Sequence, residues 1–242
     1  MPSFSEIKNK QCEIKIAEHV TIQENVVLGG KCKKISIGYG SYIGRDVFID
    51  VEELEIGDYT TIHHGSILSG VKTIIGHNCW FGHYTIIDSL GGKTIIGNNV
   101  GVGAHSQLWS HMKFGDVLAG CKWNSSGKLI LEDDVWLVGH SITGPITAQR
   151  KSMLMTGGVA LKNMEENCIY AGSPAVNVTD RLGHQFEERS KAEIIKDFNE
   201  LINQFESLYG YESGSLIAVD EFDLDKKGIT QFKPVDRLYL PI

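Results

Sequence analysis

Apolar residues recur at every sixth position over most of this chain. The repeat runs from about residue 20 to about residue 175. Grouped in threes, the repeating positions are Val20, Val26, Cys32; Ile37, Ile43, Ile49; Ile56, Ile62, Leu68; Ile75, Phe81, Ile87; Ile96, Val102, Leu108; Leu131, Leu137, Thr143; and Gln149, Met155, Leu161. Of these 21 positions, 18 carry Val, Ile, Leu, Met or Phe, far more than a hydrophobic content of 42% would place there by chance. The period of six is therefore a structural repeat.

Irregular spacings in the six-residue repeat show that three hexads form one coil. Successive groups of three hexads are 17, 19, 19, 21, 35 and 18 residues apart, and every departure from 18 follows a third hexad. A prism with three flat faces explains this, because each hexad makes one short strand and a corner while extra residues bulge from a single corner. Successive coils then share hydrogen bonds as in a parallel sheet. The pattern predicts an all-β parallel solenoid of about seven coils.

The chain beyond the repeat has a different pattern. Residues 184–209 place apolar side chains at helical spacing, which predicts an amphipathic helix that caps the open end of the prism. Residues 210–242 alternate and contain an Asp-Lys-Lys-Gly turn, so we expect a short β-hairpin extension there. The predicted division is a repeat domain over 1–180 and an extension over 181–242.

The end of the repeat resembles a known family. The stretches VWLVGHSITG, from Val135, and VALKNMEENCIYAGSPA, from Val159, are similar to the closing segment of the hexapeptide-repeat acyltransferases. The resemblance implies a left-handed parallel β-helix, a handedness that a period of six does not itself specify. Thr143 and Gln149 at inward positions, and KNME where the family has KDVP, depart from the family pattern.

One long excursion interrupts the repeat, from Trp109 to about Lys128, and His111 stands at its root. Long connections in compact domains are usually functional. A neutral imidazole can take a proton from a hydroxyl group as that group attacks a thioester. The stretch LWSHM is similar to the site of sugar O-acetyltransferases, in which a histidine at the root of a protruding loop deprotonates the acceptor. His111 is therefore the candidate general base, with Trp109 and Met112 as apolar walls.

The positions of four further histidines within their coils predict which of them are neighbours. His64 and His83 lie eight residues into the third and fourth coils and should stack, and His105 and His140 should be neighbours in the fifth and sixth. His83 occupies the place of an asparagine that contacts the acceptor in the family. His83 is accordingly both a substrate-binding candidate, with His64 and Trp109, and the second candidate for the base. Ordinary polar corner residues are the alternative interpretation of each.

The acyl donor implied by the resemblance is acetyl-CoA, bound in a groove between neighbouring β-helices of a homotrimer. Candidate donor-binding residues at matching positions are Trp136, Gly139, Gly157, Gly158 and Lys162. Arg150, Lys151 and Arg181 are further cations near the C-terminal end of the repeat that could meet phosphate groups.

Charge and cysteine content bear on nucleic-acid binding, cellular location, disulfides and zinc binding. A net charge of −7 offers no basic surface for nucleic acid, and we find neither a signal peptide nor a membrane span. We expect a soluble cytoplasmic protein. Five widely spaced cysteines without a CxxC pair do not support a disulfide framework or a zinc knuckle, so most should be core residues.

Four functions stay open at this point. The favoured one is transfer of an acetyl group from acetyl-CoA to a sugar hydroxyl within a carbohydrate. The placement of His64 and His83 also resembles N-acyltransferases that act on nucleotide-linked amino sugars. His63 and His77 fit the zinc ligands of γ-class carbonic anhydrases, but Gly82 stands at the third ligand position and His83 follows one residue late. A non-catalytic scaffold is the fourth, and we expect no metal.

Overall fold

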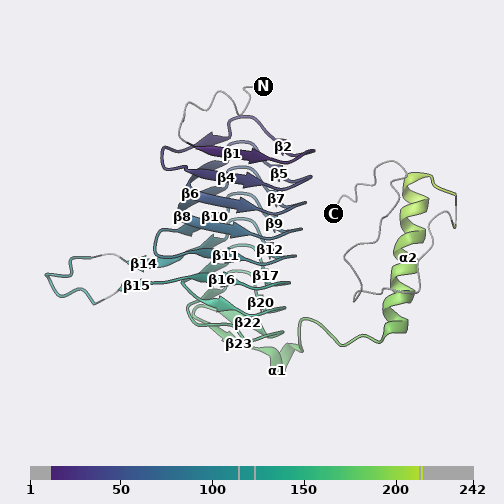
Figure 1. The fold of residues 1–242 in the computed structure, drawn as a ribbon. Helices are drawn as coiled ribbons and strands as arrows, with labels where there is room; N and C mark the ends of the chain where they lie inside the picture. The colour runs from purple at the N-terminus through teal and green to yellow at the C-terminus, as the bar shows by residue number, and fades with distance from the viewer. Residues whose placement is uncertain (1–11, 114, 123, 213, 215–242) are drawn as a thin grey trace, which may run out of the picture. The chain divides into compact units, whose positions relative to one another are not determined.

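The computed structural model describes residues 12–113, 115–122, 124–212 and 214. The chain divides into two compact units. The first ends at Glu187 and the second begins at Glu188. The first unit is a stack of short parallel strands (Figure 1). It confirms the predicted all-β fold, a left-handed parallel β-helix with a long excursion after the fifth coil.

Three sheet faces run the length of the stack. The first face holds β1 (Glu13–Ile16), β4 (Lys34–Ile37), β11 (Thr94–Ile96), β16 (Leu129–Leu131) and β19 (Thr147–Ala148). The second holds β2 (Thr21–Ile22), β5 (Tyr42–Ile43), β7 (Thr61–Ile62), β9 (Trp80–Phe81), β12 (Gly101–Val102), β17 (Trp136–Leu137), β20 (Met153–Leu154) and β22 (Ile169–Gly172). The third holds β3 (Val27–Leu28), β10 (Ile86–Ser89), β13 (Gln107–Leu108), β18 (Ile142–Thr143) and β21 (Val159–Ala160).

The corner after the third face absorbs the extra residues. Two continuous strands cross it, β6 (Phe48–Ile56) between the second and third coils and β8 (Ile67–Ile75) between the third and fourth, since each pairs with the third face at one end and with the first face at the other. After the fifth coil the same corner carries a hairpin of β14 (His111–Lys113) and β15 (Asn124–Ser126). A single variable corner is what the spacing of the hexads predicted.

The register is as predicted in the second to sixth coils and differs in the first and last. In the first coil Ile22 and Leu28 pair with Ile43 and Ile49, so the predicted Val20 and Val26 lie two residues too early. The cause is a second row of inward positions, two residues before each main one, occupied by small or short side chains such as Ser41, Val47, Cys79, Val100, Ser106 and Val135. Cys32 is buried, but it lies after β3 and outside the strands.

In the seventh coil the inward residues are Ala148, Leu154 and Ala160, each one position before the predicted residue. Of the predicted set Gln149 and Leu161 are exposed and Met155 is half-buried. Two of the true inward residues are alanines, so the aliphatic signal is weak there. A partial eighth coil follows, formed by the bridge of Met164 to Ala148 and by β22, which also pairs with the antiparallel β23 (Ala175–Asn177).

The core is one column of inward side chains. Phe81 is the largest fully buried residue, and Thr143 is fully buried in the main row as predicted. The Thr143 hydroxyl has no hydrogen-bond partner in the described part of the chain. Tight corners bring successive coils close: a Cβ on Gly103 would lie 2.2 Å from the backbone nitrogen of Gly139. Glycine is therefore required at Gly103 for packing.

The end of the first unit includes α1 (Thr179–Leu182) and a tethered segment. The Asn167 side chain accepts from the Phe186 N–H and donates to the Phe186 carbonyl oxygen, and Asn167 also contacts His184 through its carbonyl oxygen. These bonds hold residues 184–186 out of the helix that was predicted to begin there.

The second unit contains the helix α2 (Lys191–Tyr209), which is shorter than the predicted 184–209. It begins at Lys191 because Ser190 and Glu193 form a capping box that fixes the N-terminus. Its packing on the end of the prism stays a prediction, and the predicted hairpin over 210–242 lies almost wholly outside the described residues. Within the described residues no helix is both long and apolar enough to cross a membrane.

Candidate functional site

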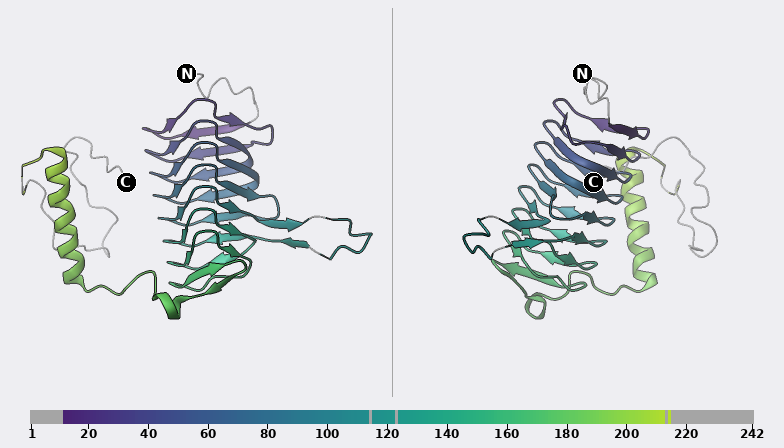
Figure 2. Two further views of the ribbon diagram at one scale, coloured as in Figure 1. Left: turned by 180° about the vertical axis from the view of Figure 1, so that it is seen from behind. Right: turned by 60° about the vertical axis from the view of Figure 1, so that its left-hand side comes forward.

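His111 is the first residue of a β-hairpin that projects from the stack. β13 ends at Leu108, and the chain then leaves the third face through Trp109 and Ser110 (Figures 1 and 2). β14 pairs with β15 in antiparallel register, with His111 opposite Ser126. The side chain of His111 is 28% exposed, so its ring is anchored on one side and accessible on the other.

Asp88 holds the ring of His111. Asp88 lies directly after Ile87, which pairs with Leu108 of the next coil, so the register carries the Asp88 side chain to the root of the hairpin. Its Oδ1 lies 2.8 Å from His111 Nδ1, and Asp88 is fully buried. The Ser110 hydroxyl donates to the same oxygen at 2.7 Å. A buried carboxylate is stable only with such partners.

This contact defines the proton positions. A carboxylate can only accept, so Nδ1 of His111 carries the hydrogen and Nε2 of a neutral ring has a free lone pair. The backbone N–H groups of Leu90 and Ser110 also donate to Asp88, each at 3.3 Å from its Oδ1. The arrangement is a histidine held by a fixed carboxylate, which is the geometry of a general base.

Trp109 stands beside this pair. Its ring lies edge-on to that of His111, with 6.0 Å between ring centres, and its Nε1 donates to the side-chain oxygen of Gln107 at 3.1 Å. The structure thus places the predicted substrate-binding residue Trp109 next to the predicted base. Met112, predicted as a second wall, lies instead toward Gly144, where an added Cβ would be 3.4 Å from its sulfur.

The other histidines form a separate column at the corner between the second and third faces. The predicted stacks are confirmed: the ring centres of His64 and His83 are 3.9 Å apart, and those of His105 and His140 are 5.1 Å apart. Tyr84 stacks on His105, which makes the column continuous. The His83 Nδ1 atom is buried and has no hydrogen-bond partner among the described residues.

Crowding makes part of this column resist protonation. Burial lowers the pKa of His83, and the neighbouring His64 and His105 lower it further. The pKa of His63 is also lowered, first by burial and then by His83 and His64. His63 is close enough for its ring centre to lie 4.5 Å from that of His83. These rings are neutral near pH 7.

The histidine column and His111 lie at opposite ends of the third face. His83 precedes β10 and Asp88 lies near its end, so five residues of extended chain, on the order of 15 Å, separate them. The structure therefore does not bring His64 or His83 to His111 within one chain. No carboxylate of the described residues contacts the His83 ring, whereas Asp88 holds His111.

The predicted donor-binding residues fall on the second face and on two corners. Trp136 is 45% exposed on the second face, and Gly139 and Gly157 lie in the turns at the corner after it. Gly158 is tightly packed, because an added Cβ would be 2.5 Å from the end of the Leu154 side chain and 2.9 Å from the Met155 carbonyl oxygen. Lys162 is exposed and follows β21, on the corner that carries His111 in an earlier coil.

The other predicted cations lie elsewhere. Arg150 and Lys151 occupy the corner between the first and second faces, where the Lys151 ammonium lies 5.3 Å from the centre of the Phe186 ring. Arg181 belongs to α1. None of these three is brought to the His111 pair.

The zinc-ligand pattern is not assembled by the described residues. His77 precedes β9 and accepts a hydrogen bond from the Asp58 N–H at 2.9 Å, whereas His63 follows β7 at the other end of the second face. Among the residues that the structure describes, no group of three or more His, Cys, Asp or Glu side chains is placed to hold a metal ion.

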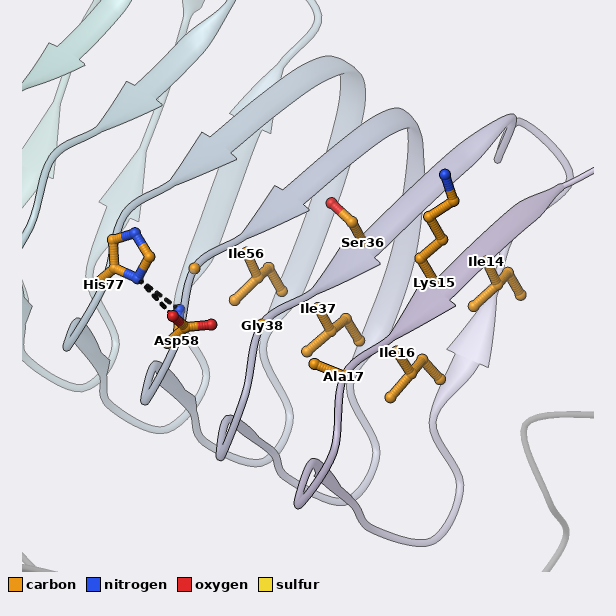
Figure 3. A pocket seen from close by; sticks show the side chains of 11 residues that line it. Ile14, Lys15, Ile16, Ala17, Ser36, Ile37, Gly38, Ile56, Asp58 and His77 are labelled. Carbon is orange, nitrogen blue, oxygen red and sulfur yellow. Dashed lines mark hydrogen bonds and ion pairs between the residues drawn. The ribbon is translucent and has the colours of Figure 1, made fainter. Parts of the chain in front are cut away.

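A shallow pocket of about 640 Å³ lies on the first coils, remote from His111. Figure 3 shows its lining, in which Ile16, Ile37 and Ile56 come from successive rungs and Asp58 and His77 close one side. It involves none of the predicted site residues.

The comparisons with known proteins give matches to part of the chain. No family model matches the chain. It is 31% identical over 116 residues to the bifunctional protein GlmU of Clostridium kluyveri, covering 42% of this chain and 25% of that protein. It is 36% identical over 107 residues to the UDP-3-O-acylglucosamine N-acyltransferase of Campylobacter curvus, covering 42% of this chain and 30% of the relative. The chain is a hexapeptide-repeat protein.

This hexapeptide-repeat protein matches about a quarter to a third of the length of these curated relatives. Similar solved structures include the polysialic acid O-acetyltransferase OatWY, at 17% identity and a TM-score of 0.48 over 81% of this chain and 96% of that one. Another is the N-acyltransferase AntD of Bacillus cereus, at 16% identity and a TM-score of 0.46 over 84% and 97% of the two chains.

Sequence reasoning about this hexapeptide-repeat protein missed two residues of the site. These residues are Asp88, which holds His111, and Gln107, which holds Trp109. A signal for Asp88 was available: it is a carboxylate directly after an inward apolar residue, one coil before the histidine at the root of the excursion. No local signal marks Gln107.

Proposed function

We propose that this protein is an acyltransferase that moves an acetyl group from acetyl-CoA to a hydroxyl group of a sugar. The observation that carries the proposal is the contact of His111 with the buried Asp88 at the root of a projecting hairpin. Acyl transfer in general, without a choice between oxygen and nitrogen acceptors, is further supported by the relative that is named as an N-acyltransferase.

In the proposed reaction His111 Nε2 takes the proton of the acceptor hydroxyl. The oxygen attacks the thioester carbonyl carbon, a C–O bond forms, and the C–S bond breaks. The leaving CoA thiolate takes the proton from the imidazolium, so the products are the O-acetyl sugar and CoA. Asp88 fixes the ring orientation throughout and stabilises the imidazolium while it carries the extra proton.

Trp109 is proposed as the wall against which the acceptor lies. Its indole ring is half-buried, fixed through Gln107 and beside the base. An aromatic face of this kind suits the apolar C–H side of a sugar ring. The sugar class rests on this wall and on the position of His111.

We propose a homotrimer in which sites form between copies. The candidate residues of one chain lie apart, with His111 and Trp109 on the corner after the third face, His64 and His83 on the corner before it, and Trp136 on the second face. A neighbouring copy would bring the two corners together. Acetyl-CoA would then lie between copies against Trp136, Gly139, Gly157, Gly158 and Lys162.

Acylation of an amino group on a nucleotide-linked sugar is the second candidate. It is favoured by the histidines of the column, since the lowered pKa of His83 keeps that ring neutral near pH 7, with a ring nitrogen open to an amino group. The relative named for N-acylation supports the same candidate.

An acceptor panel distinguishes the two. Purified protein is incubated with acetyl-CoA and either neutral glycosides, acidic oligosaccharides or nucleotide-linked amino sugars, and release of the CoA thiol is measured. We expect turnover with hydroxyl acceptors. Turnover confined to amino sugars would reverse the ranking, and no turnover with either, together with no thermal shift on adding acetyl-CoA, would favour a non-catalytic scaffold.

A further inference from the structure

Two cysteines meet at the first coil, where the β-helix begins. Cys12 directly precedes β1, and Cys32 lies in the connection between β3 and β4. β1 pairs with β4 in parallel, with Glu13 opposite Lys34, and the Glu13 N–H donates to the Lys33 carbonyl oxygen at 2.8 Å. This register sets Cys12 beside the residues that follow Cys32.

Both side chains border the apolar core of the first coil. Cys32 is 2% exposed and belongs to the core, and the half-buried Cys12 packs against that core. The Cys12 thiol donates to the Glu13 carbonyl oxygen at 3.8 Å and the Cys32 thiol to the Ile49 carbonyl oxygen at 3.5 Å, and each thiol perturbs the pKa of the other. Strand spacing and rise place their Cα atoms on the order of 6 Å apart, which lies within the range that a disulfide spans.

The other cysteines have different surroundings. The Cys79 thiol is buried and donates to the Gly97 carbonyl oxygen at 3.1 Å. Cys121 belongs to the projecting hairpin, next to Gly115, and Cys168 lies in the last, partial coil. Cys79 is therefore a matched buried control for Cys32.

We propose that Cys12 and Cys32 are an oxidation-sensitive pair whose disulfide closes the first coil on itself. Among the strands that the structure describes, β1 is the last of its sheet and pairs only with β4. Such an edge strand frays and offers unpaired backbone groups to other chains. A bond from residue 12 to residue 32 ties the start of the first coil to the start of the second, so β1 can no longer peel away.

The chemistry is thiol–disulfide exchange with a small disulfide such as glutathione disulfide. The thiolate of Cys12, the more accessible of the two, attacks one sulfur and releases one glutathione. The thiolate of Cys32 then attacks the Cys12 sulfur and releases the second glutathione. Two thiols are oxidised, one glutathione disulfide is reduced to two glutathione molecules, and no other reactant is needed.

The pair should react slowly near neutral pH. Burial raises the pKa of Cys32 to about 11, and burial also raises the pKa of Cys12. Only the thiolate reacts, so below these pKa values each added pH unit should speed the exchange by about tenfold. Because exchange is slow, the Cys12–Cys32 disulfide should form only under prolonged oxidation.

The test uses the full chain with glutathione disulfide at pH 7.5 and pH 8.5. After alkylation of the remaining thiols, peptide mass spectrometry should find a linked Cys12–Cys32 peptide that forms faster at the higher pH. Hydrogen exchange should then slow at the amides of β1 in the oxidised protein. Cys12→Ser and Cys32→Ser should each abolish both effects, and Cys79→Ser should retain them.

Three results would overturn the proposal. One is a stable glutathione adduct on Cys12 with Cys32 still open to alkylation under unfolding conditions. Another is a linked peptide that joins Cys12 to any other cysteine, within or between chains. The third is a Cys12–Cys32 bond that leaves hydrogen exchange of β1 unchanged, since the bond would then close nothing.

Discussion

At the scale of single residues, the proposed chemistry depends on a buried carboxylate and the ring that it holds. Asp88 is fully buried and accepts from His111 Nδ1 at 2.8 Å and from the Ser110 hydroxyl at 2.7 Å. These bonds leave the ring one tautomer in which Nε2 can take a proton. Asp88 is thus a positioning residue, because it acts through His111 and does not touch the acceptor.

Asp88→Asn should lower kcat by about 10²-fold or more and leave the affinity for acetyl-CoA nearly unchanged. An amide can donate to Nδ1, which favours the tautomer with the hydrogen on Nε2, and a ring in that state cannot accept the proton. Steady-state kinetics over a range of pH checks this, because loss of the carboxylate should also shift the pH profile of kcat.

Asp58→Asn is the matched control. Asp58 also contacts a histidine, with 3.3 Å between its Oδ2 and His77 Nδ1, but both side chains are largely exposed and lie away from the hairpin. The control should keep normal turnover. Normal turnover in Asp88→Asn as well would show that the contact with His111 serves packing alone.

At the scale of the strands, the hexad pattern was enough to predict the coils but not their exact register at the ends. Inward aliphatic residues are required where a coil is covered on both sides, so Ile62, Phe81 and Leu108 follow the rule. The inward positions of the first and seventh coils have less need of large aliphatic side chains. There the inward row includes Ile22, which is only half-buried, and the small Ala148 and Ala160.

The site could be predicted only in part for a related reason. His111 could be singled out from the sequence, because it lies at the start of the one long break in the repeat. Asp88 becomes visible only when the register is known, because its partner lies 23 residues away in the next coil. The stacks of His64 on His83 and of His105 on His140 followed from spacing alone, because neighbouring rungs of a solenoid are one strand apart.

Thr143→Val should stabilise the β-helix. Thr143 occupies the inward row of β18, is fully buried, and has a hydroxyl without a partner in the described chain. Valine has the same shape and removes the cost of the buried hydroxyl, so the free energy of unfolding should rise by about 1 kcal/mol. Chemical denaturation of the two proteins measures the change.

Thr85→Val is the control for that measurement, because the Thr85 hydroxyl donates to the Gly82 carbonyl oxygen at 2.8 Å and the change leaves that oxygen short of a donor. It should destabilise the protein by about 1 kcal/mol. A loss of stability in Thr143→Val would mean that its hydroxyl has a partner in the assembled protein.

At the scale of the whole molecule, the distribution of candidate residues over two corners is the reason to expect an assembly. His111 and Trp109 lie after the third face, whereas His83 and Trp136 lie before it and on the second face. Light scattering coupled to size exclusion should report three times the chain mass of 26.8 kDa. A stable monomer at assay concentrations would contradict a site shared between copies.

The identity of the general base is the central claim, and the turnover of His111→Ala tests it most directly. His111→Ala, His83→Ala and His77→Ala are compared for acetyl transfer at saturating acetyl-CoA, with acetyl-CoA binding measured separately. The account predicts a loss of about 10²–10⁴-fold in kcat for His111→Ala with normal donor binding, a weaker acceptor affinity for His83→Ala, and no change for His77→Ala. Near-normal kcat in His111→Ala together with a collapse in His83→Ala would contradict it and move the base to the histidine column.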